Sequence, residues 1–160
     1  MTAKKVIQVT PSRCVGCLNC ELACASRDWG SYFPCGSKIN LVFLKAGGQV
    51  PVACFQCDQA PCLAVCRTGA LARDPDTGVI SPDPQKCVGC RACVAVCPFG
   101  NIAWSEAGSR IEKCDQCEGA PRCVAVCPSG ALAYAEEADK SKARRRLFAE
   151  SLMEASAKEL

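Results

Sequence analysis

Apolar residues along this chain of 160 residues come in short runs, and none approaches the ~18 consecutive positions that a membrane-spanning helix needs. Runs of this length, separated by Gly, Pro and Asp, are typical of short strands joined by tight turns. We expect strands at 70–73, 102–104 and 131–134.

Turn residues indicate how the strands pair. Residues 76–78 and 106–108 each contain a Gly and precede a further apolar segment, so we expect a hairpin at both places. Near the N-terminus, residues 5–9 are expected to pair with residues 39–44, after which Gly47-Gly48 turns the chain into a further strand.

A repeated segment, Cys-x-Ala-Val-Cys, occurs at 62–66, 93–97 and 123–127, at a spacing of about thirty residues. Its two cysteines are four positions apart, and residues at this spacing share one face of a helical turn. Pro98 and Pro128 follow two of the copies and would end the turn. The pattern therefore predicts short helices that each carry two cysteines.

Sixteen of the seventeen cysteines fall into four runs of four cysteines each. Two runs follow C-x2-C-x2-C-x3-C, the spacing by which bacterial ferredoxins hold iron–sulfur cubanes, and two have a longer middle gap. The runs are Cys14-Cys17-Cys20-Cys24, Cys54-Cys57-Cys62-Cys66, Cys87-Cys90-Cys93-Cys97 and Cys114-Cys117-Cys123-Cys127.

Three closely spaced cysteines can bind three irons of one cubane, while the fourth lies one helical turn away and completes a second cluster. Sixteen thiolates are sufficient for four 4Fe–4S clusters. With a cysteine for every iron, no iron is open to a substrate, and no nucleotide-binding or hydrolase motif is present. The pattern favours electron transfer and a non-catalytic role.

Two other uses of so many cysteines are weak alternatives. A zinc-stabilised interaction module would use C-x2-C pairs, often with histidine, but the chain has no histidine and zinc does not require a triple of cysteines. A disulfide framework would require an oxidising compartment. No secretion signal is visible near the N-terminus, so we expect a cytoplasmic protein.

The formal net charge of +3 would change on loading with metal. An oxidised cubane with four thiolates carries about −2, so four clusters would take the protein to about −5. This argues against nucleic-acid binding. Large apolar side chains are few, and we expect the clusters to supply much of the folding free energy.

Five further features are candidates for a functional role. Arg13, Lys86 and Lys113 each precede the first cysteine of a run, where a cation would raise a cluster's potential, although ordinary solvated side chains are the alternative. Cys35 lies outside the runs and is expected to be a structural or free thiol, with a ligand or redox role as the alternative. Residues 138–160 have helical composition and predict a helix that packs on the body or docks a partner.

The four runs, with Lys113-Cys114-Asp115-Gln116-Cys117 opening the last and Ala-Val-Cys-Pro-Ser-Gly-Ala-Leu closing it, resemble the four-cluster iron–sulfur subunits of molybdenum and tungsten oxidoreductases, the dimethyl sulfoxide reductase iron–sulfur subunit family. The resemblance implies an α+β fold of two bacterial-ferredoxin-like modules, with short strands and helices wrapped around four cubanes. It covers about residues 5–135, within an expected domain at 1–137 that is followed by the predicted helix at 138–160.

The resemblance also implies that the first run pairs with the fourth, and the second with the third. The four implied ligand sets are Cys14, Cys17, Cys20 and Cys127 (cluster 1); Cys24, Cys114, Cys117 and Cys123 (cluster 2); Cys54, Cys57, Cys62 and Cys97 (cluster 3); and Cys66, Cys87, Cys90 and Cys93 (cluster 4).

The chain departs from the family pattern at Ala25 and Arg67, which stand where a proline often follows the last cysteine. It is also short, and most resembles the small subunit of tungsten-dependent aldehyde oxidoreductase complexes. The implied partners are a large tungsten or molybdenum pterin subunit and a second redox subunit or soluble carrier. Separately, a chain with accessible clusters at both ends could stack head-to-tail with further copies of itself. The alternatives are a soluble polyferredoxin or a partner of a hydrogenase, formate dehydrogenase or carbon monoxide dehydrogenase.

Overall fold

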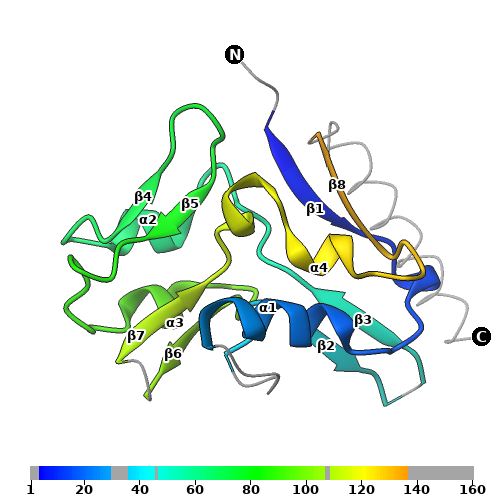
Figure 1. The fold of residues 1–160 in the computed structure, drawn as a ribbon. Helices are drawn as coiled ribbons and strands as arrows, with labels where there is room; N and C mark the ends of the chain where they lie inside the picture. Colours follow the sequence, from blue (N-terminus) through cyan, green and yellow to red (C-terminus); the bar gives the residue numbers. More distant parts are fainter. Residues whose placement is uncertain (1–3, 30–35, 46, 107–108, 137–160) are drawn as a thin grey trace, which may run out of the picture.

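The strands pair in twos and form no large sheet. In the computed structural model, which describes residues 4–29, 36–45, 47–106 and 109–136, they make four two-stranded antiparallel sheets (Figure 1). The pairs are β1 (Lys5–Val9) with β8 (Leu132–Glu136), β2 (Asn40–Phe43) with β3 (Gln49–Val52), β4 (Leu71–Arg73) with β5 (Ile80–Pro82), and β6 (Ile102–Ser105) with β7 (Arg110–Lys113).

The three strands expected from the apolar runs are confirmed as β4, β6 and β8. The two expected hairpins are confirmed as β4–β5 and β6–β7. In the first of these, the Asp74 carboxylate accepts hydrogen bonds from the backbone N–H groups of Asp76 and Thr77, which fixes the turn.

The pairing expected for residues 5–9 with 39–44 is wrong. Strand β2 pairs with β3 across the short loop that contains Gly47 and Gly48, whose φ is 90° at both positions. A local hairpin needs little loop closure and leaves β1 free for a distant partner. That partner is β8, with Val6 opposite Ala135 and Ile7 opposite Tyr134.

The cysteine-bearing helices are short, with one exception. Helices α2 (Pro61–Val65), α3 (Ala92–Val96) and α4 (Arg122–Ala125) are single turns, as predicted, but each ends just before the second cysteine of its repeat, whereas α1 (Asn19–Trp29) has eleven residues. Two short 3-10 turns, η1 (Pro11–Arg13) and η2 (Gln116–Gly119), complete the elements. Helix α1 continues past Cys24 because Ala25, unlike a proline, keeps the backbone N–H that a helix needs.

The elements gather into two halves, each with its own core (Figure 1). Strands β1, β2, β3 and β8 with α1 and α4 form one half, whose core includes Ile7, Ile39 and Leu132. Strands β4 to β7 with α2 and α3 form the other, around Ile80, Ile102 and Ile111. Because β1 pairs with β8, the first cysteine run lies beside the fourth.

Two predictions fall on residues outside the described ranges: the helix at 138–160 and the role of Cys35. Among the described residues, no helix combines the length and the apolar character that crossing a bilayer requires.

Candidate metal centres

Four cavities are each lined by four cysteines, three from one run and one from another. Cavity 1 has Cys14, Cys17, Cys20 and Cys127; cavity 2 has Cys24, Cys114, Cys117 and Cys123; cavity 3 has Cys54, Cys57, Cys62 and Cys97; cavity 4 has Cys66, Cys87, Cys90 and Cys93. The structure thus brings together the same groups of four that the resemblance implies, and no disulfide joins any of these sixteen cysteines.

The short helices explain why the last cysteine of a run lines a different cavity. Cys20 and Cys24 both lie on α1, four positions apart, which corresponds to a rise of roughly 6 Å along the helix axis. Cys20 lines cavity 1, and Cys24, one turn further along, lines cavity 2. Helix α4 packs against α1 and carries Cys123 of cavity 2, and Cys127, two residues after the helix, lines cavity 1.

Helices α2 and α3 repeat this arrangement in the other half, where they pack against each other. Cys62 on α2 lines cavity 3, and Cys66, which follows the helix, lines cavity 4. Cys93 on α3 lines cavity 4, and Cys97 after it lines cavity 3. Cavities 1 and 2 are thus connected through two packed helices and the cysteines on or just after them, as are cavities 3 and 4.

The residue before the second cysteine of every run has a left-handed backbone. In the first and third runs it is Gly16 and Gly89, each with φ of 71°, and in the second and fourth it is Gln56 and Gln116, with φ of 47° and 58°. A left-handed conformation is strained for a residue with a side chain. Both glutamines are almost fully buried, at 1% and 0% exposure. Aligning the four runs would have shown that glutamine replaces glycine there, a signal the sequence prediction missed.

Backbone N–H groups donate to the cysteine sulfurs. Lys38 N–H lies 3.3 Å from Cys24 Sγ, Leu71 N–H lies 3.4 Å from Cys66 Sγ, and Gln116 N–H lies 3.4 Å from Cys114 Sγ. Such donors stabilise negative charge on sulfur.

Burial separates the thiols into two groups. It raises the pKa of Cys114 and of Cys123 to about 12, and that of Cys20 to about 11. Burial also opposes ionisation of Cys66 and Cys127, but hydrogen bonds from nearby backbone N–H groups and a hydroxyl outweigh it and lower the pKa of both. The deeply buried thiols therefore need a cation to become thiolates.

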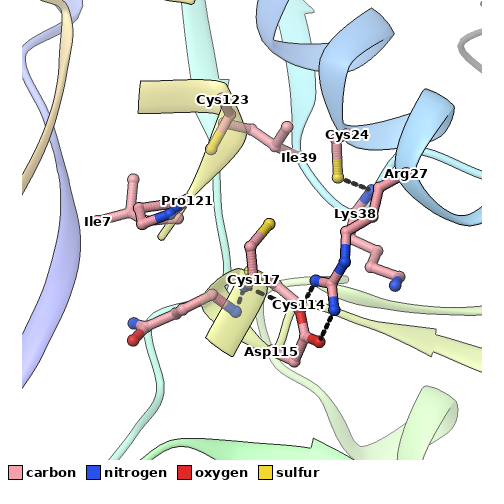
Figure 2. A pocket seen from close by; sticks show the side chains of 11 residues that line it. Ile7, Cys24, Arg27, Lys38, Ile39, Cys114, Asp115, Cys117, Pro121 and Cys123 are labelled. Carbon is pink, nitrogen blue, oxygen red and sulfur yellow. Dashed lines mark hydrogen bonds and ion pairs between the residues drawn. The ribbon is translucent and has the colours of Figure 1, made fainter. Parts of the chain in front are cut away.

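An ion pair ties the first run to the fourth at cavity 2 (Figure 2). The Arg27 guanidinium donates to both carboxylate oxygens of Asp115, at 2.6 and 2.8 Å. Burial opposes ionisation of Asp115, but the hydrogen bonds from Arg27 and from the Cys117 backbone N–H outweigh it and lower the pKa of the carboxyl. This contact exists because α1 extends beyond Cys24.

The three cations that precede the runs differ in their surroundings. Arg13 and Lys86 are exposed, and the Lys86 ammonium lies 3.2 Å from the Asp83 carboxylate. Lys113, in contrast, is fully buried, at 0% exposure. The solvated interpretation therefore fits Arg13 and Lys86 and is wrong for Lys113.

The donor set of each cavity fits a 4Fe–4S cubane, which takes four thiolates. At cavity 2 a further group fits as well. Gln116 lines the cavity, and within the described part of the chain its buried amide nitrogen, Nε2, has no hydrogen-bond partner, so a sulfur atom of a cluster would supply the acceptor. No group of three or more His, Cys, Asp or Glu side chains among the described residues is arranged to hold a single metal ion.

Comparison with known proteins agrees with this donor chemistry. A family model described as a 4Fe-4S dicluster domain matches residues 47–137, and one described as a 4Fe-4S binding domain matches residues 11–27. Since the first covers more than half of the chain, the protein belongs to the 4Fe–4S dicluster family of iron–sulfur proteins.

Several curated relatives can be named. The chain is 39% identical over 102 residues to the aliphatic sulfonate oxidoreductase, polyferredoxin-like subunit, of Pyrococcus furiosus, covering 64% of this chain and 58% of the relative. It is 36% identical to the beta subunit of NADH-dependent phenylglyoxylate dehydrogenase of Aromatoleum evansii, covering 71% and 26%. An iron–sulfur protein of Rhodospirillum rubrum is 39% identical, covering 61% and 54%. The chain thus spans less than two thirds of each relative.

Among solved structures, a chain of the active-site complex BamBC of benzoyl coenzyme A reductase, in complex with zinc, has a similar fold. The TM-score is 0.50 with 20% sequence identity, over 96% of this chain and 92% of that chain. At this identity the likeness concerns the fold alone.

The Arg27–Asp115 pair yields a stability prediction. Replacing Asp115→Asn should lower the free energy of unfolding of the metal-loaded protein by about 1–3 kcal/mol, because a partly buried guanidinium loses the carboxylate that it binds with two hydrogen bonds. Anaerobic urea denaturation, followed by loss of visible cluster absorbance, measures this. The matched control is Glu118→Gln, since Glu118 is 88% exposed and lies 3.5 Å from the same guanidinium. If the two substitutions lowered the free energy of unfolding equally, the stabilising role of the Arg27–Asp115 ion pair would be contradicted.

Proposed function

We propose that this protein is a non-catalytic electron-transfer subunit that carries four 4Fe–4S clusters, one in each cavity. The observation that carries the proposal is that each cavity is lined by four cysteines, drawn from two runs. When bound, each cluster would accept and release one electron. With four thiolates per cluster, every iron has a protein ligand, which favours electron transfer over substrate binding.

The connections between the cavities support a linear order of clusters, 1–2–3–4. Helix α1 carries a cysteine of cavity 1 and one of cavity 2 and packs against α4, while α2 and α3, which pack together, carry Cys62 of cavity 3 and Cys93 of cavity 4. Cavities 2 and 3 are joined by a hydrogen bond, in which Gln56 Nε2 donates to the Cys114 carbonyl at 2.8 Å. Gln56 is the neighbour of Cys57, which lines cavity 3, and Cys114 lines cavity 2.

Cavities 1 and 4, at the two ends of this order, each have a cysteine that is exposed to solvent. Cys17 in cavity 1 and Cys90 in cavity 4 are exposed, whereas the cysteines of cavities 2 and 3 are buried or half-buried. Exposed apolar side chains adjoin both cysteines: Val15 and Leu18 at the first end, and Val88 at the other. Electron partners would therefore approach cavities 1 and 4.

We place the protein in an oxidoreductase complex. Residues 1–137 would form the cluster-binding domain, and the predicted helix at 138–160 would pack on this domain or dock a partner subunit. The names of two relatives, a polyferredoxin-like subunit and a dehydrogenase beta subunit, support a role as a subunit. The resemblance to iron–sulfur subunits of tungsten and molybdenum enzymes supports a pterin-containing catalytic partner, such as an aldehyde oxidoreductase. A second redox subunit or carrier, or another copy of this chain, would then exchange electrons at the far end.

Electron counting tests the cluster content. Anaerobic titration with dithionite, with integration of the electron paramagnetic resonance signal, should show uptake of about four electrons per chain, alongside about sixteen irons and as many sulfides. A zinc-stabilised interaction module would contain neither iron nor sulfide and take up no electrons. That result would overturn the proposal.

The exchange of ligands between runs has a separate test. Cys17→Ala and Cys127→Ala should each lose about four irons, and the double variant should lose the same four, because both residues belong to cluster 1. The matched comparison is the Cys17→Ala, Cys123→Ala double variant, which should lose about eight irons because Cys123 belongs to cluster 2. If each run held its own cluster, both doubles would lose equal amounts of iron.

The partner is tested by purification from the native host. We expect the chain to copurify with a larger subunit at a fixed stoichiometry, and metal analysis of the complex to show tungsten or molybdenum. Light scattering of the same sample measures whether copies associate further. A purely monomeric native protein would favour the soluble polyferredoxin, and a large subunit without either metal would favour a hydrogenase or carbon monoxide dehydrogenase partner.

A further inference from the structure

Lys113 is a cation in the interior of the protein. It ends β7 and is 0% exposed, which makes it one of the most deeply buried side chains among the described residues. Its ammonium donates to three oxygens: the Ile80 carbonyl at 2.6 Å, Gln56 Oε1 at 3.1 Å and the Cys114 carbonyl at 3.1 Å. These three acceptors use all three N–H donors of the ammonium.

All three acceptors are uncharged. Among the ion pairs of the described residues, none supplies Lys113 with a carboxylate. A buried charge without a counter-charge is strongly destabilising, even when it is fully hydrogen-bonded. The protein moiety by itself therefore leaves this positive charge uncompensated.

The charge lies between two cavities. Lys113 lines cavity 3, together with Cys54, Cys57, Cys62 and Cys97. It also precedes Cys114 of cavity 2 and contacts that residue's carbonyl. Its positive charge counteracts the effect of burial on the thiols of Cys62 and Cys114, one from each cavity.

Gln56 fixes this arrangement. Its amide oxygen accepts from the Ile80 backbone N–H at 3.0 Å as well as from Lys113, and its amide nitrogen donates to the Cys114 carbonyl. The backbone carbonyl of Gln56 in turn accepts from the Lys4 ammonium at 2.6 Å. With its donor and acceptor both engaged, the side chain holds the Lys113 ammonium at the junction of the two cavities.

We propose that Lys113 is the counter-charge shared by the two inner clusters, 2 and 3, and that it raises the reduction potential of both. The inference rests on the proposed four-cluster content. Reduction adds one electron to a cubane, supplied by the neighbouring cluster in the chain, and takes its net charge with thiolates from about −2 to about −3 without making or breaking a bond. A nearby positive charge favours the more negative state.

Lys86 is a matched control within the same chain. Like Lys113, it immediately precedes the first cysteine of a run, but it is exposed and paired with Asp83. Solvent and its carboxylate partner screen its charge, so it should contribute little to the potential of cluster 4.

The test compares Lys113→Met, Lys113→Arg and Lys86→Met in the complete chain. Iron and sulfide are counted first, and each cluster's potential is then measured by redox titration with electron paramagnetic resonance. We expect Lys113→Met to lower the reduction equilibrium constant of two of the four clusters about tenfold each, which is about 59 mV for a one-electron couple. Lys113→Arg and Lys86→Met should leave all four potentials near their original values.

The outcomes separate the role of Lys113 from the proposed cluster content. If the unaltered protein does not hold four cubanes, the proposed function fails. If it holds them and Lys113→Met shifts one potential or none, or no more than Lys86→Met does, the role of Lys113 is overturned. If Lys113→Met loses clusters, retention of all four in Lys113→Arg supports charge compensation, and equal loss in both variants contradicts it.

Discussion

The separation between the last cysteine of each run and the cysteine before it is the constraint on which the structure depends. The last cysteine of each run lies four positions, roughly 6 Å of helix rise, beyond the cysteine before it, and it lines a different cavity in every run. Each cavity then needs a cysteine from a second run, and the fold must bring two runs together. The pairing of β1 with β8 does this for the first and fourth runs, and the packing of α2 on α3 does it for the others.

Charge is the second organising factor, because thiols and a lysine are buried in the interior beside the two apolar cores. The inner cavities are lined or adjoined by Cys114, Cys123 and Lys113. The two thiols are hard to ionise in the bare chain, and the Lys113 ammonium has no carboxylate partner among the described ion pairs. Anionic clusters would balance the lysine, and iron would stabilise the thiolates. In this account, cofactor and protein each supply the charge that the other lacks.

Sequence reasoning succeeded where the signal was local. Cysteine spacing, the turns after 70–73 and 102–104 and the single-turn helices all depend on residues within a few positions of each other. It failed for β1, because an apolar segment of five residues does not specify a distant partner, and β2 was closer to β3 along the chain. It could not decide between the two interpretations of Lys113, since only the packing of β5 and Gln56 against it shows that this lysine is buried. Predicting the ion pair between Arg27 and Asp115 would have required knowing that α1 continues past Cys24.

The central claim is that every cluster takes its ligands from two runs. Anaerobic crystals of the metal-loaded protein, with an anomalous difference map measured at the iron absorption edge, test it most directly. The account predicts four iron clusters, each bonded to three sulfurs from one run and one from another, with the inner two on either side of Lys113. A cluster bonded to four cysteines of one run, or single metal ions in the cavities, would contradict it.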